Sequence, residues 1–449
     1  MYAPTLYDRT RPIGSFWETT VEPGGWSALE SHGALSSGEN RPCDVAIIGG
    51  GITGLTAALH LARAGIEVCV LEAGTPAWGA SGRNGGFCCV GATWLSQSAL
   101  VKQFGMAEVG RFFQQQREGV ALVQQLANEE GFEIDRQGEG ELEVAHRADR
   151  WRSLETGYEF FTKIAGYPCQ LWSPQELAER AYHSPEAHGG LHVGVGFGLN
   201  PLKYSRGLAI ALTQRGGILY AHSPVQHWEQ DGNLHRLHTP KGTLRARRVI
   251  IATNGYTPDD LHPAVSGSLL PAISNIITTR PLTAAELAAQ GWKTEIPVYD
   301  TRRLLFYFRL LKDGRFLFGS RGGTWGDDSE ADRYRQWMTR RLGEMFPAWR
   351  EVEISHYWSG LLCGSRPLVP QIGQLPDDPT VFYALAYHGN GVATATWSGR
   401  AIAHLLTEKL TPSDLATPFR QPLRRFPLPH LRPWYVRGMF GLYGLQDRL

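Results

Sequence analysis

The chain contains few cysteines and no excess of charge of either sign. Its 449 residues include six cysteines, none of them in a C-x-x-C pair, too few for a disulfide framework and matching no zinc ligand set. We therefore predict no metal site and a reducing, cytoplasmic location. The 44 lysines and arginines nearly balance 43 aspartates and glutamates, giving a net charge of +1. No nucleic-acid partner is expected on this basis.

Long apolar runs are absent from the sequence as well. No stretch reaches the roughly 18 residues that span a bilayer, and the first residues lack the charged-then-apolar pattern of a signal peptide. Hydrophobic residues make up 42% and charged residues 19%, which is typical of a globular enzyme. We expect no membrane contact. We also expect two domains, because single cores stop growing at about 250–300 residues.

Residues 44–74 carry a dinucleotide-binding fingerprint. An apolar strand at 45–48 leads into Gly49-x-Gly51-x-x-Gly54, a helix follows, and a second apolar strand ends at Glu72. The first glycine permits a tight turn, the second lets the backbone approach a pyrophosphate, and the third lets the helix pack on the strand. Free N–H groups at the helix start bind the anion. Glu72 lies at the interval of about 20 residues from which an acid accepts a hydrogen bond from ribose.

Three further turns are rich in small residues. The segment GASGRNGG at 79–86 is either backbone lying against a flat group or a plain loop. The segment ATNGY at 252–256 ends an apolar strand, at the carboxyl edge where cofactors bind to parallel sheets. The segment HGNGV at 388–392 begins a helix. Its N-terminus is either a second site where the helix dipole binds negative charge or an ordinary helix start without a ligand.

The remaining segments alternate between helix and sheet patterns. Apolar periodicity predicts helices over 107–129 and 329–345, and Asp313-Gly314 predicts a hairpin between strands at 304–310 and 315–319. We predict a nucleotide-binding domain from 1–90, 196–270 and 355–449. An inserted substrate domain would comprise 91–195 and 271–354.

The order of these motifs, with GSRPLVPQIG at 364–373, resembles the D-amino-acid-oxidase superfamily, which includes glycine, sarcosine and γ-glutamylputrescine oxidases. The likeness extends from about Cys43 to Leu449, and GASGRNGG and the tail LYGLQDRL most resemble the γ-glutamylputrescine oxidase branch. It implies an α/β fold with a Rossmann-like FAD-binding domain and an inserted α+β substrate domain. It also implies FAD rather than NAD. Noncovalent attachment is expected, because GASGRNGG contains no histidine and Cys363 is out of register with the cysteine of sarcosine oxidases.

The fingerprint and the resemblance together predict the cofactor-binding residues. The 79–86 loop would lie along the flavin, and the 389–392 turn would aim a helix N-terminus at flavin N1 and O2. The backbone of Val225 would meet the adenine edge. The full predicted set is Gly49, Gly51, Ile52, Thr53, Gly54, Glu72, Ala73, Ala80, Ser81, Asn84, Gly85, Gly86, Val225, Ala252, Thr253, Asn254, Arg366, Gly389, Asn390, Gly391 and Val392.

The resemblance also suggests the substrate. Arg366, in the Gly-x-Arg-Pro pattern, corresponds to an arginine that grips a substrate carboxylate in D-amino acid and glycine oxidases; the alternative is an arginine paired with a nearby acid. We predict oxidation of a carboxylate-bearing amine or amino acid, with Arg366, His388 and Tyr307 as candidate catalytic or pocket residues. The α-hydrogen would leave as hydride to flavin N5, and the imine would hydrolyse. Oxygen would take the electrons and give peroxide, or another acceptor would take them.

Two alternative functions remain open. One is a γ-glutamylputrescine-type amine oxidase, whose reacting carbon bears no carboxylate. The other is a flavoprotein dehydrogenase that passes electrons to a partner or quinone. The tail from Trp434 has aromatic residues at helical spacing beside Arg432 and Arg437, a pattern that either supports the second function or packs the tail against the body.

Overall fold

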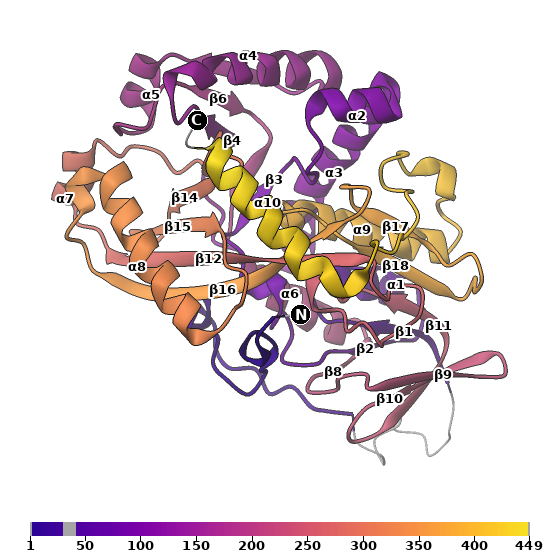
Figure 1. Ribbon diagram of the computed structural model, residues 1–449. Coiled ribbons are helices and arrows are strands. Elements are labelled where there is room, and N and C mark those ends of the chain that lie inside the picture. The colour runs from indigo at the N-terminus through magenta and orange to yellow at the C-terminus, as the bar shows by residue number, and fades with distance from the viewer. Residues whose placement is uncertain (1, 30–41, 448–449) are drawn as a thin grey trace.

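The computed structural model describes residues 2–29 and 42–447. Within these residues two eight-stranded sheets and a two-stranded sheet are surrounded by helices (Figure 1). The α/β class with a parallel nucleotide-type sheet is confirmed.

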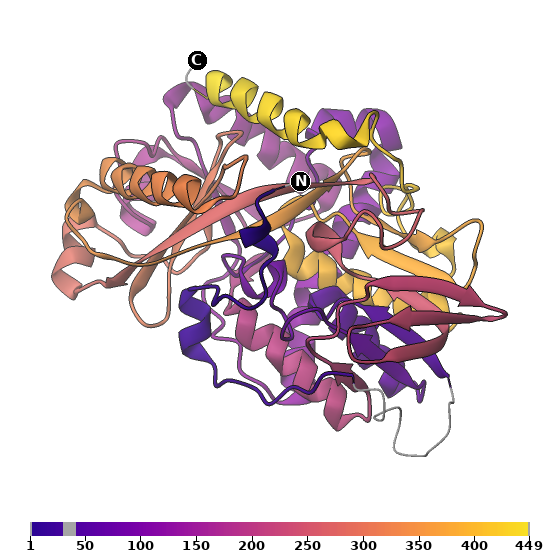
Figure 2. The ribbon, with the colours of Figure 1, turned by 60° about the horizontal axis from the view of Figure 1, so that its bottom comes forward.

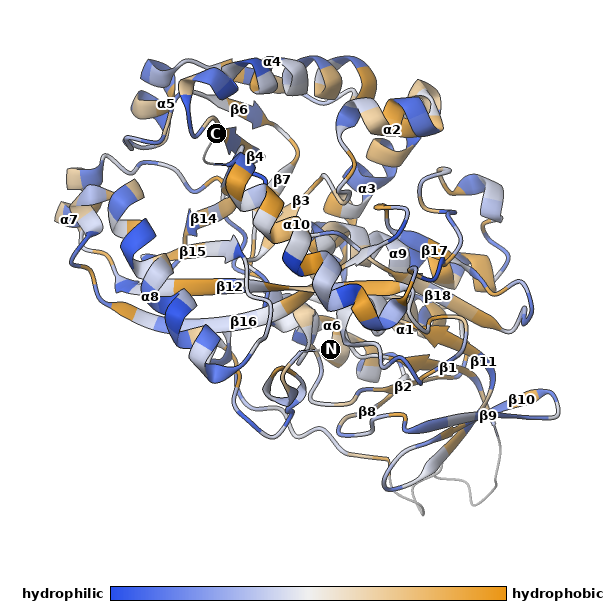
Figure 3. Cartoon of the chain, viewed as in Figure 1, coloured by the Kyte–Doolittle hydropathy of each residue, from blue (hydrophilic) through white to orange (hydrophobic). Residues whose placement is uncertain are grey.

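The first sheet has a parallel centre, in the order β17-β18-β11-β1-β2-β8, and β9 and β10 extend from β11 as a hairpin. Its buried strands are almost continuously apolar, as expected where both faces are covered, and Figure 3 shows β1, β11 and β18 as hydrophobic. The strands are β1 (Cys43–Ile48), β2 (Val68–Leu71), β8 (Ile218–Tyr220), β9 (His227–Asp231), β10 (Leu234–His238), β11 (Thr243–Ile251), β17 (Gln371–Gln374) and β18 (Val381–Leu385).

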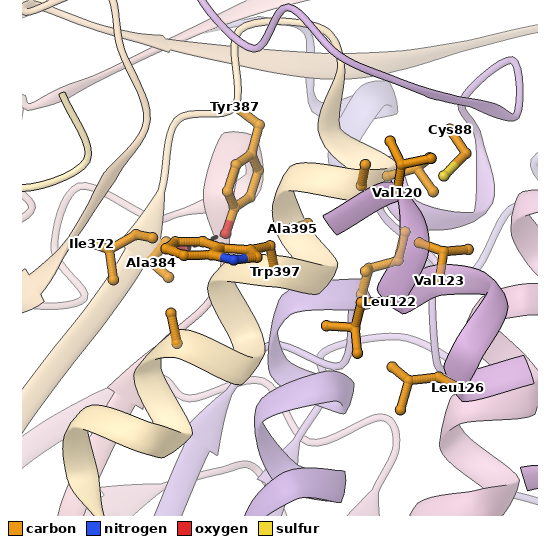
Figure 4. Packing of buried hydrophobic residues seen from close by; sticks show 14 of the residues in the cluster. Cys88, Val120, Leu122, Val123, Leu126, Ile372, Ala384, Tyr387, Ala395 and Trp397 are labelled. Carbon is orange, nitrogen blue, oxygen red and sulfur yellow. Dashed lines mark hydrogen bonds between the residues drawn. The ribbon is translucent and has the colours of Figure 1, made fainter. Parts of the chain in front are cut away.

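Helices α1 (Ile52–Arg63), α3 (Met106–Glu130), α6 (Pro201–Gln214) and α9 (Gly391–Leu406) form the helical part of the largest core. Figure 4 shows α3 residues such as Val120 and Leu126 and Trp397 of α9, which belong to the same buried cluster. Helices α1 and α9 approach so closely that a Cβ on Gly399 would lie 2.5 Å from the backbone oxygen of Thr53.

The second sheet runs in the order β16-β12-β15-β14-β13-β4-β6-β5. Its strands are β4 (Glu141–Val144), β5 (Cys169–Trp172), β6 (Gly190–Val193), β12 (Leu269–Pro281), β13 (Val298–Asp300), β14 (Phe306–Leu310), β15 (Arg315–Arg321) and β16 (Ile354–Ser365). Between this sheet and helices α7 (Ala284–Gln290) and α8 (Asp328–Met345) lies an aromatic core that includes Trp292, Phe316, Phe346 and Trp349. Helices α2 (Gln97–Phe104), α4 (Trp151–Phe160) and α5 (Pro174–Arg180) complete this part, and β3 (Phe87–Cys89) pairs with β7 (Gly196–Gly198).

Most of the elements predicted from the sequence are present. The two predicted helices are α3 and α8, and the predicted hairpin is β14–β15. The proposed domain boundaries need one correction. Strand β16 lies within the range assigned to the nucleotide domain, yet it pairs along β12 in the second sheet. The physical reason is its long antiparallel register with β12, which no local pattern reveals.

Both ends of the described chain pack on the body. Phe16 and Trp17, near the N-terminus, are buried. Helix α10 (Arg432–Gln446) crosses the molecule and ends near β4, and the views from two sides agree on its surface position (Figures 1 and 2). None of the described helices is long and apolar enough to cross a bilayer.

The contact between α1 and α9 provides a test of the fold. Gly399→Ala should destabilise the protein by about 1–3 kcal/mol, because the added methyl group meets a fixed backbone oxygen. Gly441→Ala in α10 is the matched control, since a Cβ there meets nothing within 4 Å. In an exposed helix, alanine stabilises the protein by about 0.5–1 kcal/mol relative to glycine. Thermal unfolding midpoints should fall for the first variant only, and equal midpoints would contradict this packing.

Candidate active site

A cavity of about 1240 Å³ lies at the carboxyl ends of β1, β2 and β11 and extends along the second sheet. Small-molecule sites usually occupy about 300–1,000 Å³. The cavity therefore has room for a dinucleotide and a second molecule.

The fingerprint turn at the cavity requires its glycines. Gly49 has a φ of +111°, and a Cβ there would lie 2.7 Å from the backbone oxygen of Ala252. A Cβ on Gly54 would lie 2.0 Å from the oxygen of Gly49, and one on Gly51 would lie 2.7 Å from Ser81 Oγ. Gly54 packs the helix against the turn and does not line the cavity, whereas Gly49 and Gly51 do.

The start of α1 faces the same cavity. The helical ladder begins with Leu55 N donating to the oxygen of Gly51, so the N–H groups of Thr53 and Gly54 precede it. Ile52 N donates to Ser81 Oγ at 2.9 Å, which ties the helix to the glycine-rich loop. The remaining N–H groups and the helix dipole fit an anionic pyrophosphate.

Glu72 lies at the end of β2 and is 8% exposed. Its carboxylate accepts hydrogen bonds from Gly50 N and Gly74 N, each at 2.7 Å. Burial raises the pKa of Glu72, while these two hydrogen bonds act in the opposite direction. A carboxylate has about four acceptor sites, so it can also accept from ribose hydroxyls. Ala73 lines the cavity beside it.

The glycine-rich loop is held from two directions. Trp17 Nε1 donates to the oxygen of Asn84 at 2.9 Å, and Trp358 Nε1 donates to the oxygen of Arg83 at 2.7 Å. The Asn84 side chain bonds within the loop, to the oxygens of Ala80 and Ser81 and to Gly86 N. The loop therefore presents mainly backbone to the cavity.

Gly86 lies behind this loop and does not line the cavity, unlike Ala80, Ser81, Asn84 and Gly85. Its φ is +74°, and a Cβ there would lie 1.9 Å from the oxygen of Leu199. The buried Arg309 donates to the oxygens of Gly85 and Leu199. Burial lowers the pKa of Arg309 to about 10. Arg309 was not predicted as a site residue, because its only signal in the sequence is an arginine inside the apolar strand FYFRL.

The ends of β11 and β18 are joined at the cavity. Asn254, at a φ of 44°, accepts a hydrogen bond from Ala386 N at 2.8 Å. Ala252 and Thr253 line the cavity next to it, and so does Val225 after β8. All four positions belong to the predicted cofactor set, which remains a prediction.

The 388–392 turn lines the cavity as predicted. Gly389 has a φ of +125°, and Asn390 makes no side-chain cap for α9, so the N-terminus of α9 lies open to the cavity. His388 Nε2 accepts from Ser365 N at 3.0 Å. Burial lowers the pKa of His388 to about 3, so this side chain is neutral and fixes the turn rather than carrying charge.

A polar group lies on the opposite wall. Tyr307 OH and Ser274 Oγ are hydrogen-bonded at 2.9 Å, and burial raises the pKa of Tyr307 to about 12. Arg321 is paired in register with Ser274 and also lines the cavity. Its guanidinium is 2.9 Å from the position that a Cβ on Gly389 would occupy.

The guanidinium of Arg321 forms no hydrogen bond or ion pair with another residue in the described parts of the chain. Its guanidinium lies 5.9 Å from the centroid of the Trp94 ring, and burial lowers its pKa. A cation without a counter-charge therefore faces the cavity.

The predicted position of Arg366 needs correction. Arg366 is exposed in the turn that follows β16, and it is not among the described residues that line the cavity. The chain reverses there, with Ser365 Oγ donating to the oxygen of Val369 at 2.9 Å, so the Arg366 side chain leaves the sheet. Arg321, not predicted from the sequence, lies in the cavity instead.

The fold and this site are those of a nucleotide-cofactor oxidoreductase, and a second sheet forms one wall of the cavity. The family model described as FAD dependent oxidoreductase matches residues 44–405. The chain belongs to this family, and its cofactor is FAD. The turns and Glu72 described above are the residues that fit it.

Relatives and solved structures agree with this assignment. The chain is 31% identical to gamma-glutamylputrescine oxidoreductase of Escherichia coli (strain K12), covering 92% of this chain and 94% of that protein. It is 23% identical to glycine oxidase of Bacillus subtilis (strain 168), covering 85% and 97%. The structure of glycine oxidase from Geobacillus kaustophilus superposes with a TM-score of 0.71 at 23% identity, covering 86% of this chain and all of that one.

Glu72 provides a test of the cofactor site. Glu72→Ala should weaken FAD binding by about 1.5–3 kcal/mol, the usual contribution of a hydrogen bond to a charged group. Fluorescence titration of the apoprotein with FAD measures this change. Glu159→Ala, at an exposed position of α4, is the control. Equal affinity in the two variants would show that ribose is bound elsewhere.

Proposed function

We propose that this protein oxidises a carboxylate-bearing amine or amino acid. The observation that carries the proposal is the unpaired Arg321 guanidinium in the cavity, beside the hydroxyl groups of Tyr307 and Ser274. The cofactor contacts predicted above are part of the same proposal.

The charge of Arg321 favours an anionic ligand. A buried cation without a partner is costly, and a ligand carboxylate removes that cost with two parallel hydrogen bonds. Tyr307 and Ser274 add hydroxyl groups on neighbouring strands. These groups would orient the substrate with its amine and reacting carbon toward the 389–392 turn.

The chemistry depends on positioning by the protein. Bound FAD supplies the two-electron acceptor for the substrate. The open N-terminus of α9 would stabilise negative charge that develops next to it. His388 is neutral and hydrogen-bonded to Ser365 N, and no other base is required when the amine binds in its neutral form. The protein therefore positions the amine and does not remove a proton from it.

Two other candidate functions have specific support. The name of the E. coli relative indicates γ-glutamylputrescine, whose reacting carbon bears no carboxylate. A dehydrogenase with a protein or quinone acceptor is favoured by α10, where Trp434, Leu442 and Leu445 are exposed. Peroxide yield under air separates an oxidase from a dehydrogenase.

Arg321 and Arg366 form a matched pair of variants. Arg321→Lys should lower kcat/KM for carboxylate-bearing amines, because an ammonium cannot reproduce the planar guanidinium. The loss of transition-state stabilisation should be about 2–4 kcal/mol. Arg366→Lys should leave kcat/KM unchanged, since Arg366 is exposed outside the cavity. Flavin content should remain constant in both. Equal losses, or a loss with Arg366→Lys alone, would contradict the assignment to Arg321.

The attachment of FAD is expected to be noncovalent. Cys363 lines the cavity, but burial raises its pKa to about 12, so it remains an unreactive thiol. Acid precipitation should leave FAD in the supernatant, as absorbance spectra will show. Flavin that pellets with the chain would refute this expectation.

A further inference from the structure

The cavity continues along the second sheet from Arg321 to β4. Glu141 and Glu143 of β4 line it there, together with Tyr299 of β13 and Phe161. Alternate residues of a strand point to the same face, so both carboxyl groups lie on one side of β4. Tyr299 is paired in register with Glu143 and therefore lies beside it.

These two acids lack partners of opposite charge. Glu141 is 1% exposed, and its Oε2 has no hydrogen-bond partner. Neither acid forms an ion pair with a lysine or arginine in the described parts of the chain. Arg302 also lines the cavity, but it is already paired with Asp300 and Glu186.

Because both acids are buried, ionising them without a partner of opposite charge costs free energy. Burial raises the pKa of Glu141 to about 8 and that of Glu143 to about 7. The titratable groups that influence or face them are neutral thiols and phenols and one paired acid: Cys89, Tyr167, Cys169, Tyr299 and Asp300. A ligand cation would stabilise both carboxylates, and the aromatic rings of Tyr299 and Phe161 suit a cation as well.

The distance between the two acids and Arg321 determines how far apart the charged groups of a ligand must be to reach both. Strands β15, β14, β13 and β4 are consecutive in the sheet, so three strand spacings, about 14 Å, separate Arg321 from the acids across the sheet. Along the strands, Glu143 is level with Gly319 through Tyr299 and Tyr307, two residues from Arg321. Side chains from both ends shorten the gap. A ligand that spans it carries its two charges on an extended chain of several atoms.

We propose that Glu141 and Glu143 bind a protonated amino group of the substrate at the end of the cavity away from Arg321. This inference rests on the proposed function and narrows its substrate class. The substrate would be an amine that carries a carboxylate and, several atoms away, a second nitrogen held as an ammonium ion.

Binding of 6-aminohexanoate and hexanoate to the FAD-containing enzyme tests the proposal. The two ligands share the carboxylate and the chain, and only the first has the distal ammonium. The wild type should bind 6-aminohexanoate about 10–100-fold more tightly, as expected for a hydrogen bond between charged groups. Calorimetry near pH 7 in buffers of different ionisation enthalpy should detect proton release, because the cation ionises the acids.

The variant Glu141→Gln/Glu143→Gln should lose both the preference and the proton release. Glu139→Gln, an exposed position just before β4, should retain both. Equal affinities for the two ligands in the wild type, or a preference that persists in the double variant, would overturn the proposal. If the double variant fails to hold FAD, the wild-type comparison and its proton release decide alone.

Failure of this inference can be distinguished from failure of the proposed function. Loss of the preference in the double variant supports the cation subsite even if no amine reduces the flavin. Conversely, flavin reduction by carboxylate-bearing amines without any preference for 6-aminohexanoate would leave the proposed function standing and remove the subsite.

Discussion

The close approach of α1 to the ends of β1 and β11 is the constraint on which the site depends. A Cβ on Gly54 would lie 2.0 Å from the oxygen of Gly49, and a Cβ on Gly49 would lie 2.7 Å from the oxygen of Ala252. No side chain fits at these contacts. Because the turn stays tight, the start of α1 faces the carboxyl ends of the strands. The cavity lies at this edge, and Gly399 lets α9 pack closely against α1.

The cavity divides into regions of different charge. At one end, the open helix starts and Glu72 suit the phosphates and ribose of FAD. Arg321 adds an unpaired positive charge near the 389–392 turn, and the acids of β4 at the far end would become negative when a ligand cation binds beside them. Buried charges are stable only when paired. The cavity walls are therefore organised for ligands that supply the missing charges.

Much of the nucleotide site could be predicted because its signals are local. The glycines, Glu72 and the 388–392 turn owe their roles to positions close in sequence, and the hairpin at Asp313-Gly314 is equally local.

The side chains that the second sheet presents to the cavity could not be predicted in this way, because they depend on long-range strand pairing. Whether Arg366 or Arg321 faces the cavity depends on the register of β16 and β15 with β12. Glu141 and Glu143 alternate with buried residues as on any half-exposed strand, and only the tertiary packing of distant residues such as Tyr167 and Tyr299 reveals that they are buried.

Anaerobic mixing of the enzyme with a panel of amines tests the central claim most directly. The panel would include glycine derivatives, D- and L-amino acids, and free and γ-glutamylated polyamines, with bleaching of the flavin absorption as the readout. We predict bleaching by amines that carry a carboxylate on the reacting carbon. Bleaching only by amines without one, or no bleaching by any member although dithionite bleaches the same sample, would contradict it.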